Sequence, residues 1–259
     1  MNSIKDLNQL RSTILAMAQK SKEGHIPSSL SILDIVWVLY TRVLNVDPKN
    51  PLLSRRDRFF LSKGHASLAL YVVLAKLGFF SENELEHFAE FKSILGGHPD
   101  RLKVPGLEAS TGSLGHGFPQ AIGTALALKI RGESARVFVL IGDGESNEGT
   151  IWESALLASQ YQLSNLVCIL DHNHSSDRAL KMGDLRAKFE SFGWNVREIN
   201  GHDHHEIELA MKNTSSGQPL FIIANTIKGK GIDVMENNPE WHHKIPSTSE
   251  VAIFLEELA

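Results

Sequence analysis

Two polar residues that lie far apart in the sequence have the chemistry of ligands for a hard divalent cation. Asp143, in the turn Gly142-Asp143-Gly144, offers carboxylate oxygens, and Asn173 offers an amide oxygen. Oxygen ligands of these types suit Mg²⁺ or Ca²⁺ and do not suit zinc. Each residue lies just after an apolar run, and two consecutive parallel strands would bring the two side chains together. The pair therefore predicts a Mg²⁺ site, with Ca²⁺ as the alternative metal.

The same turn has features of a diphosphate site. Gly142 and Gly144 let the backbone approach a ligand closely. A helix predicted to begin near Gly149 adds free N–H groups and a dipole that favours an anion. Phosphate oxygens, a backbone carbonyl and water would then complete the shell of a metal held by Asp143 and Asn173. An isolated Gly-Asp-Gly is more often only a tight turn, so this interpretation depends on the rest of the chain.

An alternation of strands and helices in the second half of the chain predicts the scaffold that positions these residues. Strand–helix–strand units connect parallel strands by right-handed crossovers, so the expected fold class is α/β, a parallel sheet with helices on both faces. Ligands of such sheets gather at the carboxyl ends of the strands. Strands are predicted at 135–142, 165–171, 194–199 and 219–226, and helices at 150–161, 182–193 and 203–212.

The first half of the chain is predicted to be mainly helical. Apolar residues recur at helical spacing from Leu7 to Ala18, and a second apolar segment covers 30–44. Ser81 and Glu84 have the spacing of a capping box and predict a further helix start. A short strand at 58–62, a helix at 67–79 and a long Gly- and Pro-rich loop at 96–117 are also expected; loops of that length are often functional. Because no repeat or composition shift marks a linker, residues 1–259 are expected to form a single domain.

Composition and charge narrow the class of protein. The 259 residues are 42% hydrophobic and 22% charged, which is ordinary for a globular chain. A net charge of −4 and a pI near 6.3 give no electrostatic reason to expect nucleic acid or an anionic membrane surface as a partner. The longest apolar stretches are expected to be too short to span a bilayer, and the N-terminal segment lacks the continuous apolar core of a signal peptide. A cytoplasmic protein is therefore predicted.

The segment GDGESNEGTIWESALLASQYQLSNLVCILDHN, residues 142–173, resembles the thiamine diphosphate motif of transketolases. Six further segments stand in transketolase order, so the resemblance covers nearly the whole chain. It implies the thiamine diphosphate-binding fold, thiamine diphosphate as cofactor and transfer of a two-carbon ketol unit from a ketose to an aldose. The six segments are SKEGH (21–25), DRFFLSKGHAS (57–67), GGHP (96–99), STGSLGHG (110–117), TIKGKG (226–231) and WHHKIP (241–246).

The resemblance implies roles for residues at the cofactor. Asp143 and Asn173 would bind the metal together with the carbonyl of Ser175, and the backbone of Gly144 would contact the diphosphate. Gly112 would lie near the amine of the aminopyrimidine. The other implied cofactor contacts are His65, Leu114, Asn173 and His242.

The resemblance also implies catalytic roles. His65 and His242 would lie near the diphosphate and the reaction centre, and His25 and His98 would face the C1 and C2 oxygens of the donor ketose. Glu148 and Glu153 would join a carboxylate network that couples the two cofactor sites of a dimer. His202, His204 and His205 are assigned no specific role.

Three segments depart from the transketolase pattern. Residues 26–29 read Ile-Pro-Ser-Ser where small glycines are usual, and they border the substrate funnel, so the donor is expected to be unusual. Residues 174–178 read His-Ser-Ser-Asp-Arg, which leaves the carbonyl ligand open. His243 replaces a glycine that often follows the Trp-His pair, so His242 is the better match and His243 the fallback.

The transketolase glutamate that activates the cofactor lies in a second, pyrimidine-binding domain, whereas this chain ends at Ala259, where the first domain normally ends. The expectation is therefore the N-terminal subunit of a split transketolase, active with a pyrimidine-binding C-terminal subunit in a heterotetramer on sugar or sugar-phosphate substrates. The alternatives are the alpha subunit of a 2-oxoacid dehydrogenase-type enzyme, a fragment of a deoxyxylulose-phosphate synthase, or a non-catalytic cofactor-binding homologue.

Overall fold

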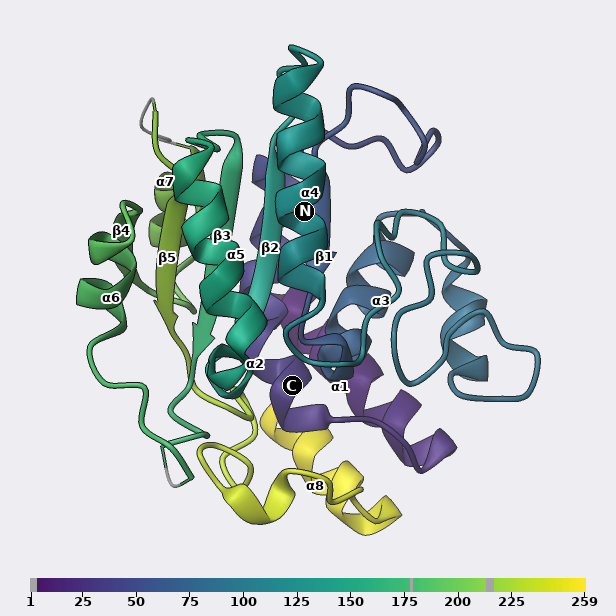
Figure 1. Cartoon of the computed structure of the whole chain (residues 1–259). Helices are drawn as coiled ribbons and strands as arrows, with labels where there is room; N and C mark the ends of the chain where they lie inside the picture. Colours follow the sequence, from purple (N-terminus) through teal and green to yellow (C-terminus); the bar gives the residue numbers. More distant parts are fainter. Residues whose placement is uncertain (1–3, 178, 213–216) are drawn as a thin grey trace.

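Five parallel strands form one sheet in the order β1-β2-β3-β5-β4 (Figure 1). The computed structural model describes residues 4–177, 179–212 and 217–259. Gly142 pairs with Asp171 and His172 pairs with Asn225, so the central strands end at one edge of the sheet. The strands are β1 (Arg58–Leu61), β2 (Val137–Gly142), β3 (Leu166–His172), β4 (Asn195–Asn200) and β5 (Leu220–Asn225).

Helices cover both faces of the sheet and divide the interior into two cores. Successive side chains of a strand point to opposite faces. In β2, Phe138 and Leu140 join the core of α1 (Ile4–Ser21), α2 (Ile26–Val38), α3 (Ser67–Lys76) and α7 (His204–Lys212). Val139 and Ile141 join the core of α4 (Gly117–Ile130), α5 (Gly149–Gln160) and α6 (Leu185–Ser191). The predicted α/β class with helices on both faces is confirmed.

Helix α2 is mostly apolar because it is enclosed by other helices, and its polar residues, Ser28, Ser29, Ser31 and Asp34, are buried as well. All of its residues are buried, and it packs between α1, α3 and α7. With the π-helical turn Leu39–Val43 it forms an apolar run of 18 residues, 26–43, that is long enough to cross a membrane, so the sequence expectation about apolar stretches was wrong. Within the protein 89% of that run is buried, which accounts for its composition by core packing.

A helix begins after Ser81 as predicted, but it is a 3₁₀ helix, Glu82–His87, without the predicted capping box. The Ser81 side chain accepts a hydrogen bond from the backbone N–H of Asn83, whereas the Glu84 N–H donates to the Ser81 carbonyl. Two helices, α4 and α8 (Thr248–Glu257), have no counterpart in the sequence expectations. The capping box at α8 uses the Ser247 side chain and Glu250. Residues 88–116 carry no helix or strand; the loop predicted at 96–117 therefore begins earlier, at 88, and ends at 116, because Gly117 starts α4.

Candidate active site

A cleft of about 300 Å³ opens at the carboxyl edge of the sheet, where β2 and β3 end. Most of the residues predicted to hold the cofactor line this cleft, although they come from segments that span the chain from α2 to the region before α8. The lining residues are His25, Ser28, Lys63, His65, Gly112, Leu114, Gly142, Asp143, Gly144, Glu145, Asn173, Ser175, Lys228 and His242. The structure therefore brings together all but three of the predicted site residues: His98, Glu148 and Glu153.

The side chains of Asp143 and Asn173 are both hydrogen-bonded to Ser175. One carboxylate oxygen of Asp143, Oδ1, accepts hydrogen bonds from the Gly144 N–H at 2.7 Å and from the Ser175 hydroxyl at 3.3 Å. The Ser175 N–H donates to Asn173 Oδ1 at 3.1 Å. The second oxygen of Asp143, Oδ2, is buried and belongs to the few side-chain atoms of the described chain without a hydrogen-bond partner. A buried carboxylate oxygen left in this state suits a cation.

The donor set fits a hard divalent cation that also binds phosphate. Within the described ranges, no group of three or more His, Cys, Asp and Glu side chains is placed to hold a metal by itself. A site with one carboxylate and one amide oxygen instead leaves positions for phosphate oxygens and water, as Mg²⁺ requires. The residues present therefore fit a metal–diphosphate pair, and Asp143, Asn173 and Ser175 would hold its metal.

A buried ion pair beneath this site had no specific signal in the sequence. The Lys63 ammonium contacts Asp171 Oδ2, and the side chains are 4% and 0% exposed. Asp171 Oδ1 accepts hydrogen bonds from the Ser31 hydroxyl at 2.7 Å and from the Thr226 hydroxyl. The Asn173 amide donates to Asp171 Oδ2 at 3.0 Å, so this network orients the proposed metal ligand. Burial alone raises the pKa of the Asp171 carboxyl, but Lys63 and the hydrogen bonds outweigh it and hold that pKa below its usual range.

A second buried carboxylate, Glu145, is hydrogen-bonded both to the long loop and to the Gly-Asp-Gly turn. Its Oε1 accepts from the Gly115 N–H at 2.8 Å and from the Ser62 hydroxyl, and its Oε2 accepts from the Gly142 N–H at 3.2 Å. Burial raises the pKa of Glu145. Because Leu114 and Gly115 are neighbours, Glu145 fixes the loop that lines the cleft.

Imidazole rings surround the mouth of the cleft. The His25 ring centroid lies 5.0 Å from that of His65, 5.7 Å from that of His242 and 4.0 Å from that of His243. Burial lowers the pKa of His25 to about 4 and that of His65 to about 2, and neighbouring cationic groups add to both shifts. These two rings are therefore neutral at pH 7, and each can donate one hydrogen bond and accept another.

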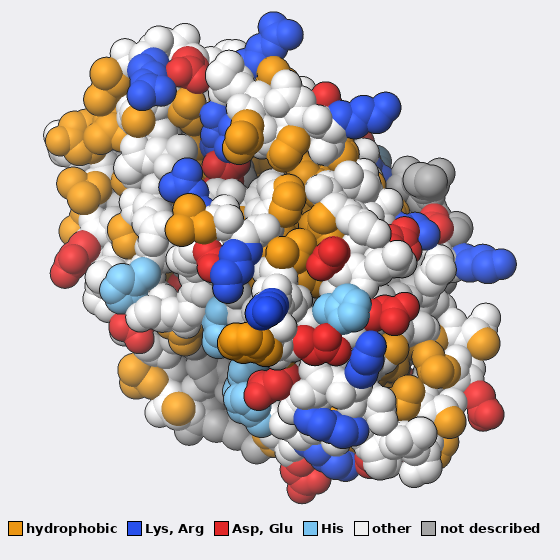
Figure 2. Space-filling view, turned by 90° about the vertical axis from the view of Figure 1, so that its right-hand side faces the viewer, with side chains coloured by type: hydrophobic (Ala, Val, Ile, Leu, Met, Phe, Trp, Pro, Cys, Tyr) orange, Lys and Arg blue, Asp and Glu red, His pale blue; other side chains and the backbone are white. Residues whose placement is uncertain are grey.

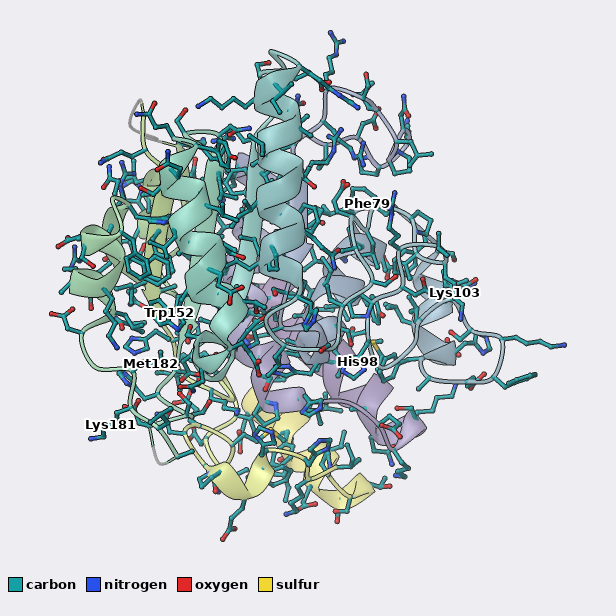
Figure 3. The ribbon with its side chains drawn as sticks, in the orientation of Figure 1. Phe79, His98, Lys103, Trp152, Lys181 and Met182 are labelled. Atoms are coloured by element: carbon teal, nitrogen blue, oxygen red, sulfur yellow. The ribbon has the colours of Figure 1, made fainter. Side chains whose placement is uncertain are left out.

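His98, the other histidine that was predicted to face the donor ketose, lies in the long loop between α3 and α4 (Figure 3). A Cβ built on Gly112 would lie 3.1 Å from the His98 ring, so the ring packs directly over Gly112. Gly112 itself lines the cleft, which places His98 at its border. Figure 2 shows histidine side chains in the lower half of the face it displays, among lysine and carboxylate side chains.

Two lysines face the cleft. Besides Lys63, the Lys228 ammonium lies there, 3.0 Å from His242 Nδ1. Burial and then Lys63 lower the pKa of Lys228. The TIKGKG segment was recognised from the sequence, but the role of Lys228 was not. Because Lys63 is already paired with Asp171, the Lys228 ammonium is the cation that suits a diphosphate carrying a metal ion.

Glu148 and Glu153 lie outside the cleft and are exposed on and just before α5. The cleft borders the 3₁₀ turn Gly144–Asn147, and the first turn of α5 at Gly149 does not line it, which corrects the predicted helix contact. The Trp152 ring of α5 (Figure 3) has its centroid 5.5 Å from that of the buried Phe189 ring of α6, so Trp152 is a packing residue.

The parallel α/β sheet has, at its carboxyl edge, a cleft whose residues fit a diphosphate, as expected of a diphosphate-binding domain. Residues 3–258 match the family described as transketolase, thiamine diphosphate binding domain, and the chain therefore belongs to the transketolase family.

Some relatives have about the length of this chain, whereas others are more than twice as long. It is 41% identical over 254 residues to one subunit of the apulose-4-phosphate transketolase of Actinobacillus succinogenes, covering 96% of this chain and 92% of the relative. It is 37% identical over 243 residues to a 6-deoxy-6-sulfo-D-fructose transketolase subunit of Clostridium sp., covering 91% and 88%. The transketolase structure from Campylobacter jejuni superposes with a TM-score of 0.87 at 30% identity; all of this chain is covered but only 46% of that one. The chain thus spans less than half of that solved transketolase.

Proposed function

We propose that this chain is the thiamine diphosphate- and metal-binding subunit of a two-chain transketolase, a glycolaldehyde transferase that is active only with a pyrimidine-binding partner subunit. One observation carries the proposal: the chain spans 92% of a relative that is named as one transketolase subunit but only 46% of a solved transketolase, and the residues that line its cleft fit a diphosphate with a metal ion. The family match favours this activity over the 2-oxoacid dehydrogenase alternative.

The chain's own residues would bind and orient the reactants. Asp143, Asn173 and the Ser175 carbonyl would hold Mg²⁺ against the diphosphate, with Lys228 balancing part of its charge. When bound, thiamine diphosphate supplies a thiazolium carbanion that takes up the two-carbon unit. The neutral ring of His25 would donate to and accept from the hydroxyl groups of the donor sugar, and the His98 ring would contact the same sugar. His65 and His242 would stand beside the reaction centre.

The substrates are proposed from the names of two relatives. One is named for apulose 4-phosphate and the other for 6-deoxy-6-sulfo-D-fructose, which are ketoses with an anionic substituent. We propose a ketose of that kind as donor and an aldose as acceptor. The departure at Ile26-Pro27-Ser28-Ser29 supports a specialised donor, because Ser28 lines the cleft. A cytoplasmic location is retained as a prediction.

The outward face of α5 supports the partner proposal. Leu156 is 53% exposed, Leu157 is 50% exposed and Tyr161 is 49% exposed, on the same helix that carries Glu153. An apolar face of this kind marks a site of association, and obligate interfaces commonly bury more than about 2,000 Å² in total. The proposed assembly is a heterotetramer of two such chains and two partner chains, with Glu148 and Glu153 near the interface.

Reconstitution tests the proposal. The purified chain, the purified partner chain and a mixture of the two would be assayed for ketol transfer with a panel of phosphorylated and sulfonated ketoses, thiamine diphosphate and Mg²⁺. Transfer by the mixture alone is expected. Transfer by this chain alone, at a purity that excludes host transketolase, would refute the two-chain proposal, and so would a mixture that binds the cofactor but transfers nothing from any ketose.

A further inference from the structure

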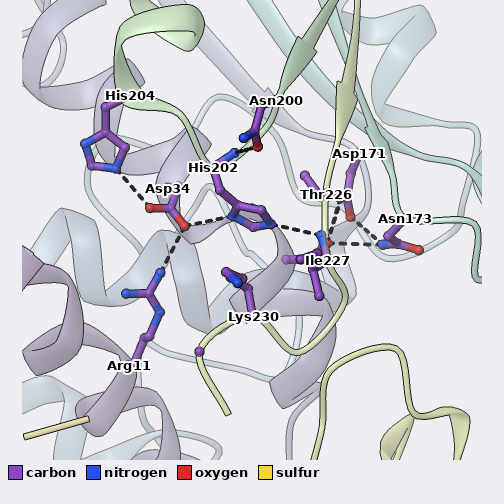
Figure 4. Close-up of polar contacts among 12 residues, drawn as sticks. Arg11, Asp34, Asp171, Asn173, Asn200, His202, His204, Thr226, Ile227 and Lys230 are labelled. Atoms are coloured by element: carbon purple, nitrogen blue, oxygen red, sulfur yellow. Dashed lines mark hydrogen bonds and ion pairs between the residues drawn. The ribbon is translucent and has the colours of Figure 1, made fainter. Parts of the chain in front are cut away.

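A buried polar cluster lies next to the cofactor cleft and has no part in the roles described so far. Its centre is Asp34 of α2, whose side chain is 5% exposed. Asp34 Oδ2 accepts from Arg11 at 3.0 Å and from His202 Nδ1 at 3.0 Å, and Oδ1 contacts His204 Nε2 at 2.9 Å (Figure 4). His202 and His204 were assigned no role from the sequence, and the structure corrects that assignment.

His202 connects this cluster to the TIKGKG segment, residues 226–231. Its second ring nitrogen, Nε2, accepts a hydrogen bond from the Ile227 backbone N–H at 2.9 Å. Since Nε2 accepts, Nδ1 must carry the proton that is donated to Asp34, so Asp34 selects the tautomer that can hold Ile227. His204 contacts the same carboxylate, but the Ile227 N–H bonds only to His202 among the described residues.

Ile227 stands between two residues of the cofactor site. Before it, Thr226 donates to Asp171 and contacts Ser31. After it, Lys228 lines the cleft. The cluster also supports the far end of the segment, because a Cβ built on Gly231 would lie 2.9 Å from the Arg11 side chain.

We propose that His202 is a positioning residue for the diphosphate: held by Asp34, it fixes the Ile227 backbone so that the Lys228 ammonium stands over the cofactor cleft. This inference rests on the proposed function, since it concerns the same cleft. It adds a residue that touches no reacting group and that sets cofactor affinity through the conformation of residues 226–231.

The test compares two substitutions of His202 that both remove its hydrogen bond to Asp34, of which only one also removes the acceptor for the Ile227 N–H. His202→Leu removes both hydrogen bonds of the ring, His202→Gln keeps an acceptor near the position of Nε2, and His204→Leu is the matched control. Affinity for thiamine diphosphate with Mg²⁺ would be measured by calorimetry on the complex with the partner chain. Hydrogen exchange of the Ile227 amide in the same complex without cofactor gives a readout that does not depend on binding.

His202→Leu is expected to weaken cofactor binding about tenfold and to lose protection of the Ile227 amide, because one net hydrogen bond to the segment disappears. His204→Leu is expected to keep affinity within about twofold, and His202→Gln to recover most of it. In a Lys228→Met background, His202→Leu should cause little further loss, because both changes act through one contact.

Three results would overturn the proposal. Equal losses of affinity in His202→Leu and His204→Leu would show an effect on general stability. Full protection of the Ile227 amide in His202→Leu would show that the ring does not hold the segment. Additive losses with Lys228→Met would show that His202 acts elsewhere. If the unmodified complex bound no thiamine diphosphate, the proposed function would fail together with this inference. The first three results would contradict only the inference and would not affect the proposed function.

Discussion

Replacing Lys63 with methionine should destabilise the protein through the carboxylate that it leaves behind. Lys63 and Asp171 form an ion pair whose side chains are 4% and 0% exposed, so solvent cannot replace the lost cation. Methionine fills a similar volume without charge. The expected effect is therefore the cost of a buried, uncompensated charge and not of lost packing.

The size of the effect follows from the remaining contacts of Asp171. Removing one partner of a buried ion pair costs about 3–5 kcal/mol. Asp171 keeps hydrogen bonds from Ser31, Thr226 and Asn173, which favours the lower end, about 3 kcal/mol. For a chain of this length that corresponds to a fall in Tm of about 6–12 °C.

The effect should depend on pH in a defined direction. In the unmodified protein the pKa of Asp171 is lowered, so its charged form contributes stability above the unfolded pKa near 4, and this stability is lost as pH falls through the folded pKa. Without Lys63, burial dominates and the pKa of the carboxyl rises. The variant then takes up a proton at higher pH, so its deficit in Tm should narrow as pH falls from 7 towards about 4.

Thermal unfolding monitored by circular dichroism at several pH values would measure this prediction. The exposed Lys49→Met change is the matched control and should leave the free energy of unfolding within about 0.5 kcal/mol. A double variant, Lys63→Met with Asp171→Asn, should recover much of the loss because no buried charge remains. A Tm unchanged in Lys63→Met, or a double variant no more stable than the single one, would refute the reasoning.

Three further predictions concern the site and its partner. Asp143→Ala should abolish Mg²⁺-dependent binding of thiamine diphosphate in calorimetry, and unchanged affinity would remove Asp143 from the metal site. His98→Ala should lower ketol transfer by about 10²-fold while leaving cofactor affinity nearly intact, since it loses a contact to the sugar; collapse of cofactor binding in a folded variant would contradict that role. Leu157→Arg on the exposed face of α5 should leave the isolated chain folded and prevent assembly with the partner in gel filtration, and normal assembly would place the interface elsewhere.

The sequence predicted the central strands β2, β3 and β5 well because they are short runs of mainly apolar residues. Both faces of β2 and β3 are buried, so all their residues up to Gly142 and Leu170 must be apolar, and that pattern is visible without a structure. Helix α4 was missed because its sequence, GFPQAIGTALALKI, has Gly and Pro in the first turn and an internal Gly123. Those residues suggest a loop, although Pro is tolerated where the N–H has no helical partner.

Some residues of the site can be predicted from local sequence pattern, whereas others are recognised only from the tertiary structure. Asp143 and Asn173 were predicted because each lies at the end of its own apolar strand. Asp171 and Lys63 are 108 positions apart, and Asp34 and His202 are 168 positions apart. Neither pair follows from local pattern. The strand order β1-β2-β3 brings Lys63 to Asp171, and the packing of α2 brings Asp34 to His202.

Calorimetric titration with thiamine diphosphate tests most directly the central claim, that this chain supplies one part of a divided cofactor site. The titration would be run on this chain alone, on the partner chain alone and on an equimolar mixture, each with saturating Mg²⁺. Weak binding is expected for each chain by itself, and tight binding of one cofactor per pair of chains is expected for the mixture. Binding by this chain alone that is as tight as binding by the mixture would contradict the claim.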